Sequence, residues 1–121
     1  MVISEIFRIF VSNILKMNIY NKSSLIEFYK KHADSKIPFE IWYEDITAKS
    51  WKTPNELKKA YGGSISILKN YRAVFDIKGN DYRLIAEINY EHGWIFIKFL
   101  GTHKEYDKVD ANTVDLYKRK K

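Results

Sequence analysis

Two side chains near the end of the sequence have the types that proton transfer on a phosphate ester requires. His103 follows Gly101 and Thr102 directly after an apolar segment, where functional side chains are often displayed. Tyr106 comes three residues later and shares a face with His103 if this segment is helical. An imidazole moves protons near neutral pH, and RNA supplies its own nucleophile in the 2′-hydroxyl. These two residues therefore have the groups that ribonuclease catalysis requires. When His103 is considered alone, a surface or helix-capping role is the simpler interpretation.

Arg83 and Lys98 are expected on one face of a β-sheet. Both lie in segments of alternating polarity, so Lys98 shares its face with Trp94 and Phe96. A sheet face of cations and rings suits RNA, because rings stack on bases and cations meet phosphates. A solvated face, on which long charged side chains cover exposed rings, explains the pattern equally well. The core face of the second segment is expected to hold Ile95, Ile97 and Phe99.

Metal and cofactor sites have little support in the sequence. Its carboxylates are scattered, without the paired-carboxylate or His-x-x-x-His spacing that holds a cation. Asp107 and Asp110 lie close together but have no histidine partner of metal-site type. The glycine pair at 62–63 is expected to end a helix, whereas the glycines of a phosphate-binding loop come directly before a helix. We therefore expect chemistry without metal or cofactor, and structural roles for His32, at a helix end, and His92, in a hairpin.

Capping signals and helical spacing predict the helices that must support such a sheet. Ser24 with Glu27 forms a capping box for the first helix. Apolar residues at helical spacing place the second helix at about 37–49. Thr53, followed by a proline and then Glu56, is the strongest helix start in the chain.

After residue 63 the apolar period changes to the alternation of strands. Three alternating segments, 71–77, 82–89 and 94–100, are joined by short turns and predict an antiparallel meander. A short strand is expected at 17–20, and a last helix or turn begins near Thr102. The predicted fold class is α+β, with N-terminal helices packed on an antiparallel sheet and a short C-terminal helix.

The 121 residues are enough for one domain with one hydrophobic core. We expect this domain at 17–117, between an extension at 1–16 and a basic tail at 118–121. The extension has an apolar helical stripe, and Met17 is a more conventional domain start. The extension is therefore expected to be either a docking helix or the product of an upstream start codon.

The net charge of +6 is unevenly distributed, since residues 49–72 hold six basic residues against one acidic residue. Clustered cations favour a polyanion such as nucleic acid, although on charge alone a merely soluble surface is equally acceptable. No apolar run is long enough to span a membrane, and no signal peptide is expected. The absence of cysteine fits a reducing cytoplasm.

Three segments of the chain resemble one family of bacterial toxins. Residues 70–85 read NYRAVFDIKGNDYRLI, which is similar to the N-x-R-x-V-F-x-I-x-G-N-x-Y-R-L core of HigB-family toxins. Residues 99–108 read FLGTHKEYDK and contain the G-T-H-x-E-Y-D ending of that family, and WKTP at 51–54 also matches. The resemblance covers about residues 17–114, and its two main motifs are long and ordered.

The resemblance assigns roles to the residues singled out above. It implies that Arg83 holds and stabilises the scissile phosphate as a bidentate cation. It also implies that His103 serves as acid or base, and that Tyr106 orients or transfers a proton. The further residues expected to bind RNA are Lys58, Lys59, Arg72, Asn80 and Lys98.

The same resemblance implies a RelE-like fold and an mRNA interferase that acts without metal, commonly on the ribosome, and leaves a 2′,3′-cyclic phosphate and a 5′-hydroxyl. The expected partner is a HigA-type helix-turn-helix antitoxin that also binds operator DNA. Two alternatives are a non-catalytic toxin on the same fold, like the gyrase-poisoning ParE relatives, and a plain RNA-binding module. A proton-transfer pair such as His103 and Tyr106 argues against the first alternative, because a toxin that only binds does not need one.

Overall fold

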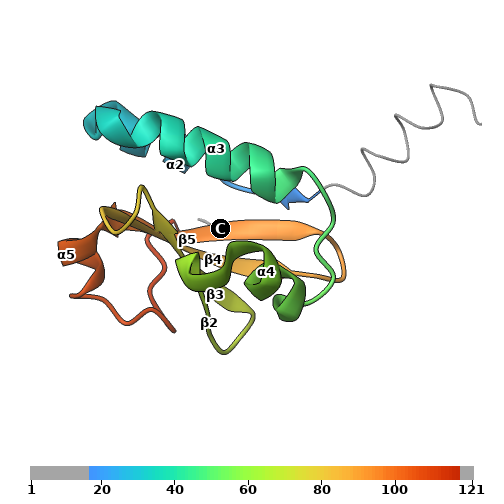
Figure 1. Cartoon of the computed structure of the whole chain (residues 1–121). Helices are drawn as coiled ribbons and strands as arrows, with labels where there is room; N and C mark the ends of the chain where they lie inside the picture. Colours follow the sequence, from blue (N-terminus) through green and yellow to red (C-terminus); the bar gives the residue numbers. More distant parts are fainter. Residues whose placement is uncertain (1–16, 118–121) are drawn as a thin grey trace, which may run out of the picture.

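Five strands form one sheet in the order β1-β5-β4-β3-β2 (Figure 1). The structure, a computed structural model, describes residues 17–117, so the expected extension at 1–16 and the tail at 118–121 lie outside the described residues. In chain order the elements are β1 (Asn18–Ile19), α2 (Lys22–Lys31), the 3-10 helix η1 (Ala33–Ser35), α3 (Lys36–Thr47), α4 (Pro54–Tyr61), the 3-10 helix η2 (Gly62–Ser64), β2 (Ile65–Ile67), β3 (Arg72–Ile77), β4 (Tyr82–Asn89), β5 (Trp94–Thr102) and α5 (His103–Tyr106).

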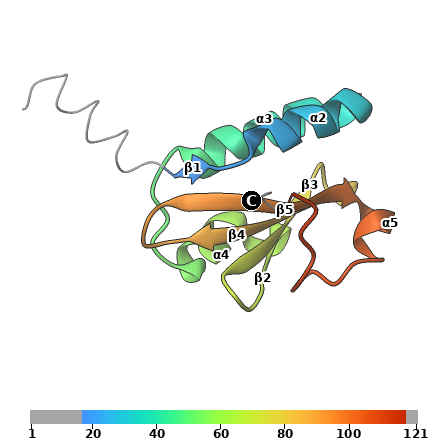
Figure 2. The ribbon, with the colours of Figure 1, turned by 180° about the vertical axis from the view of Figure 1, so that it is seen from behind.

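The predicted meander and fold class are confirmed. Strands β3, β4 and β5 pair antiparallel in chain order. Two pairings were not predicted: β2 adds antiparallel to β3, and β1 adds parallel to β5, which makes the sheet mixed. Helices α2 and α3 lie together on one side of the sheet in both views (Figures 1 and 2).

The sheet face beneath these helices carries the main hydrophobic core. Alternate residues of the central strands point into it, as their period predicts. The opposite face, which we call the open face, carries a smaller second core of Val74, Ile85 and Phe99. The main core includes Leu25, Phe39, Trp42, Ile46, Trp51, Leu57, Phe75, Leu84, Ile88, Ile95 and Ile97.

A β-bulge at Lys98 divides β5 between the two cores. Ile85 pairs with Phe99 and the next residue of β4 pairs with Ile97, so Lys98 has no partner in β4. Because of this extra residue, the side chains after Lys98 point to the opposite face from the one that strict alternation predicts. Phe99 therefore lies in the second core, and its expected position beside Ile95 and Ile97 is wrong.

The chain after α5 packs on the second core. Val109 and Val114 contact this core, and the backbone N–H of Leu116 donates to the free carbonyl of Lys98 at 2.8 Å. Arg72 is buried, and its guanidinium donates to the carbonyls of Ala111 at 3.2 Å and Val114 at 2.7 Å. We call residues 108–117 the C-terminal segment, which Arg72 and the bulge hold against the open face.

The starts of the helices were predicted with mixed success. Thr53 caps α4, because its hydroxyl accepts from the backbone N–H of Glu56. The expected capping box at Ser24 is wrong: α2 begins three residues earlier, after Asn21, and the buried Ser24 hydroxyl donates to the Asn21 carbonyl. The amide of Asn21 instead pairs with the backbone of Ile97, donating to its carbonyl and accepting from its N–H, which fixes α2 to β5.

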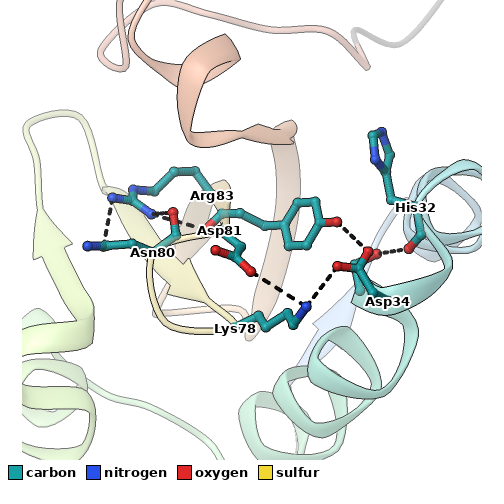
Figure 3. Close-up of polar contacts among 8 residues, drawn as sticks. His32, Asp34, Lys78, Asn80, Asp81 and Arg83 are labelled. Carbon is teal, nitrogen blue, oxygen red and sulfur yellow. Dashed lines mark hydrogen bonds and ion pairs between the residues drawn. The ribbon is translucent and has the colours of Figure 1, made fainter.

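A polar cluster joins η1 to the turn between β3 and β4 (Figure 3). Asp34 accepts hydrogen bonds from the Lys78 ammonium at 2.8 Å and from the Tyr82 hydroxyl. Lys78 has a φ of 54° and Gly79 a φ of 63°, so the turn uses the left-handed region, which costs a lysine more than a glycine. The same turn carries Asn80, so Asp34 links the helical layer to the residues beside Arg83.

Removing the Arg72 guanidinium should release the C-terminal segment. Arg72→Met keeps an aliphatic stem but leaves the carbonyls of Ala111 and Val114 without their charged donor. We expect the free energy of unfolding, measured by urea denaturation, to fall by about 2 kcal/mol, and amide hydrogen exchange to accelerate in residues 109–117. Lys69→Met, at an exposed position, is the matched control. Unchanged exchange in this segment would show that Arg72 does not hold it.

The contribution of Asp34 should depend on pH. Hydrogen bonds from Lys78 and then Tyr82 hold the pKa of Asp34 below its ordinary value. A carboxyl whose pKa is lowered on folding stabilises the fold above its unfolded pKa, and the contribution is lost as pH falls through the folded pKa. Thermal melts of the wild type and Asp34→Asn should therefore differ at pH 6, and the difference should shrink as the pH falls below the ordinary pKa of aspartate, about 3.9. The difference should be small because Asp34 is largely exposed; a constant difference across this range would contradict the assignment.

Candidate active site

One end of the sheet brings the three expected catalytic residues into one neighbourhood. Arg83, near the start of β4, pairs across the sheet with Gly101, near the end of β5. His103 follows β5 directly as the first residue of α5, and its backbone N–H donates to the carbonyl of Asp81 at 3.1 Å. The guanidinium of Arg83 lies 5.6 Å from the ring centre of Tyr106. We call the neighbourhood of Arg83, His103 and Tyr106 the Arg83 corner.

A capping box fixes the direction of α5. The Thr102 hydroxyl accepts from the backbone N–H of Glu105, and the Glu105 carboxylate accepts from the backbone N–H of Thr102. The Thr-x-x-Glu pattern of residues 102–105 is the sequence signal for this start. Because the helix begins where β5 ends, the positions of His103 and Tyr106 follow from the strand.

Arg83 is a buried cation held by its neighbours. Its side chain is 9% exposed, and all three guanidinium nitrogens have protein acceptors. Nε lies 3.2 Å from the carboxylate of Asp76, which stands directly opposite in β3. Asn80 accepts from the other two nitrogens, through its backbone carbonyl and its side-chain oxygen, each at 3.1 Å (Figure 3), and the Tyr82 carbonyl also accepts.

His103 is exposed and has a carboxylate partner. Its Nδ1 lies 3.2 Å from Oδ2 of Asp107, and the side chains are 47% and 59% exposed. Of the two neutral tautomers of the imidazole, a carboxylate at Nδ1 selects the one that carries its proton on Nδ1, and in that tautomer Nε2 is an acceptor. From the sequence, Asp107 was considered only as a metal ligand and this pairing was missed, although the i, i+4 spacing would have indicated it.

Tyr106 is anchored by its ring. It is half-buried and packs on the second core, with its ring centre 6.3 Å from that of Phe99. The bulge at Lys98 is what brings Phe99 to this face, so the position of Tyr106 depends on it.

The five other residues expected to bind RNA are dispersed. Asn80 is part of the Arg83 corner through its contacts with the guanidinium. Arg72 and Lys98 lie farther along the sheet, where Arg72 binds backbone carbonyls and the Lys98 ammonium lies 3.1 Å from the carboxylate of Asp115.

The two lysines of α4 lie outside the sheet. Lys58 donates to the carbonyls of Gly62 and Ile65, while Lys59 is exposed. The structure therefore brings one of the five to Arg83.

The two other histidines have different surroundings from His103. His32 stacks on Phe28, with ring centres 4.4 Å apart, and contacts Tyr82 edge-on. His92 is exposed in the turn between β4 and β5.

Residues 17–117 offer no support for two further classes of site. None of the helices described there is both long enough and apolar enough to cross a membrane. That part of the chain also holds no cluster of three or more histidine or acidic side chains with the geometry of a metal site.

Comparison with known proteins identifies the family of the chain. Residues 35–109 match the family model HigB_toxin, described as the RelE-like toxic component of a toxin–antitoxin system. A protein of Escherichia coli O6:H1 named mRNA interferase HigB is 30% identical over 94 residues, which cover 77% of this chain and 91% of that relative. The family match includes the whole Arg83 corner, and the observed fold is the one the resemblance implies. The chain therefore belongs to the HigB_toxin family of toxin components of toxin–antitoxin systems.

Proposed function

We propose that the protein is an endoribonuclease that cleaves mRNA and so inhibits translation, and that the Arg83 corner is its active site. The observation that carries the proposal is the joining of Arg83, Tyr106 and His103 at one end of the sheet. The name of the Escherichia coli relative, mRNA interferase, supports the same activity. The reaction we propose is attack of the 2′-oxygen on the phosphorus with departure of the 5′-oxygen, giving a 2′,3′-cyclic phosphate and a 5′-hydroxyl.

Arg83 supplies a fixed positive charge beside the scissile phosphate. Asp76 and Asn80 hold its guanidinium, so little conformational entropy is lost when a phosphate binds. These contacts also limit the geometry: a bidentate phosphate must replace at least one of the present acceptors. The side-chain oxygen of Asn80 orients the guanidinium, and it is the acceptor that a phosphate oxygen would replace.

His103 and Tyr106 handle the two protons of the reaction. Nε2 of His103 takes a proton from the 2′-hydroxyl as a base or gives one to the leaving 5′-oxygen as an acid, while Asp107 orients the ring through Nδ1. The Tyr106 hydroxyl orients the reacting groups or relays the second proton. Both steps require side chains that can reach bound RNA, which fits the exposure of His103.

The partners of the protein follow from its family and are part of the proposal. A toxin component implies an antitoxin, for which we propose the HigA-type helix-turn-helix class. The substrate is mRNA, which we propose is cut on the ribosome in the cytoplasm. The net charge of +6 supports an RNA partner.

Loss of either catalytic side chain should relieve toxicity. We expect expression of the wild type to stop growth, and His103→Ala or Arg83→Ala to restore it with a fall in cleavage of about 100-fold or more. His92→Ala, which removes an exposed histidine from the far hairpin, should remain toxic. Circular dichroism should show that each variant is folded. If both variants stay fully toxic, the Arg83 corner is not the active site.

The ends of the cleaved RNA distinguish an enzyme from a toxin that only binds. After a brief pulse of expression, mapping of mRNA 5′ ends should reveal new termini that carry a 5′-hydroxyl and are absent with His103→Ala. Intact mRNA together with a DNA-damage response would favour a gyrase-directed binder. Binding of RNA without new termini would indicate an RNA-binding module.

A further inference from the structure

A cavity lies on the sheet beyond the C-terminal segment. It has a volume of about 640 Å³, within the range of pockets that hold small ligands. Its lining is unusual for a strongly basic protein because it combines three rings with acidic and amide side chains. The lining residues are Lys52, Tyr71, Glu87, Ile88, Asn89, Tyr90, Glu91 and Phe96.

Two of these rings are well placed to stack on a planar ligand. Tyr71 is 70% exposed and has a φ of 62°, after Asn70 with a φ of 59°, so the backbone holds a bulky residue in a region it rarely adopts. The carbonyl of Tyr71 accepts from the backbone N–H of Ile88 at 2.8 Å, which ties this turn to β4. Phe96 is half-buried, and its ring centre lies 5.4 Å from that of Tyr20 and 6.5 Å from that of Trp94, with the Lys98 ammonium at 5.9 Å.

Glu87 places an unpaired acceptor beside Phe96. The two residues stand directly opposite each other in β4 and β5, and Glu87 is half-buried. Its cross-strand neighbour on the other side is Arg72, whose guanidinium is directed to the carbonyls of Ala111 and Val114. Within residues 17–117 the Glu87 carboxylate has no hydrogen-bond or ion-pair partner.

We infer that this cavity binds a base of the RNA substrate, one that carries an exocyclic amino group. The exposed Tyr71 supplies a ring face on which any base can stack, Phe96 adds an apolar wall, and the Glu87 carboxylate accepts a hydrogen bond from the amino group of cytosine, adenine or guanine. Uracil has no such group, so a carbonyl oxygen would face the carboxylate. Two acceptors form no hydrogen bond, which disfavours uracil. Glu87 and Glu91 outnumber Lys52 in the lining, so its net negative charge disfavours a phosphate inside the cavity.

The cavity is separate from the Arg83 corner. Glu87 and Arg83 share the open face and lie four residues apart in β4, about 13 Å. Ile85 and the C-terminal segment lie between them. The inference rests on the proposed function, and it assigns to this cavity a base away from the cleaved bond.

Binding of short RNA by a full-length protein made inactive with His103→Ala tests the inference. The probes are fluorescein-labelled oligo(A), oligo(C) and oligo(U), with affinity measured by fluorescence anisotropy at one salt concentration. Oligo(A) and oligo(C) should bind about tenfold more tightly than oligo(U), and Glu87→Gln should reduce this preference to near unity. Glu44→Gln, an exposed position on α3, should leave it unchanged. An equal preference with and without Glu87→Gln overturns the inference.

A second variant separates stacking from base recognition. Tyr71→Asn removes the ring while keeping a residue that tolerates a positive φ. All three probes should then bind about tenfold more weakly, with the preference for amino-bearing bases retained. Unchanged affinity would overturn the role of Tyr71 and with it the cavity.

The outcomes also distinguish this inference from the proposed function. If the wild type cleaves mRNA but the inactive protein binds the three probes equally, the cavity is overturned and the ribonuclease stands. If the wild type leaves mRNA intact but Glu87→Gln abolishes a measured base preference, the cavity stands and the ribonuclease is overturned.

Discussion

The extra residue at Lys98 is the constraint on which the second half of the structure depends. Before the bulge, β5 sends Ile95 and Ile97 into the main core; after it, Phe99 lies on the open face. This change adds Phe99 to Val74 and Ile85 in the second core, and the Lys98 carbonyl accepts from the backbone N–H of Leu116. A regular strand would place Phe99 under the helices and remove the ring beneath Tyr106.

The burial of Arg83 imposes a second constraint. A cation that is 9% exposed must be paired, because an unpaired charge away from water is costly. Asp76 reaches it from the facing strand, and Asn80 from a turn that Asp34 ties to the helical layer. The guanidinium is consequently fixed by β3 and by the turn that follows it, which favours preorganisation but leaves less of its hydrogen-bonding capacity for a ligand.

The sequence predicted those features that local pattern controls. The meander, the start of α4 and the position of His103 at the end of β5 are examples. Alternation could not reveal the bulge, because one extra residue changes the facing without changing the polarity of the segment. Nor could it reveal that Arg72 binds carbonyls 39 and 42 residues away, since that contact exists only after the C-terminal segment has packed. Asp76 was recoverable, because the hairpin register places it opposite Arg83.

Charge is unevenly distributed on the helical side of the sheet. Helix α3 carries exposed Ile37 and Ile41 and, apart from Lys36, only acidic charged residues, so its surface repels phosphate, whereas the neighbouring α2 carries Lys22, Lys30 and Lys31. On the open face, Arg83 and Arg72 are buried and already paired, while the imidazole of His103 remains exposed. Under the proposed function, attraction of the RNA comes mainly from exposed lysines such as Lys104 and Lys108, whereas the buried Arg83 determines the position of the phosphate. Exposed lysines would then provide the long-range attraction, and the buried arginine would provide the local positioning. The attraction by the lysines should weaken strongly as the salt concentration rises.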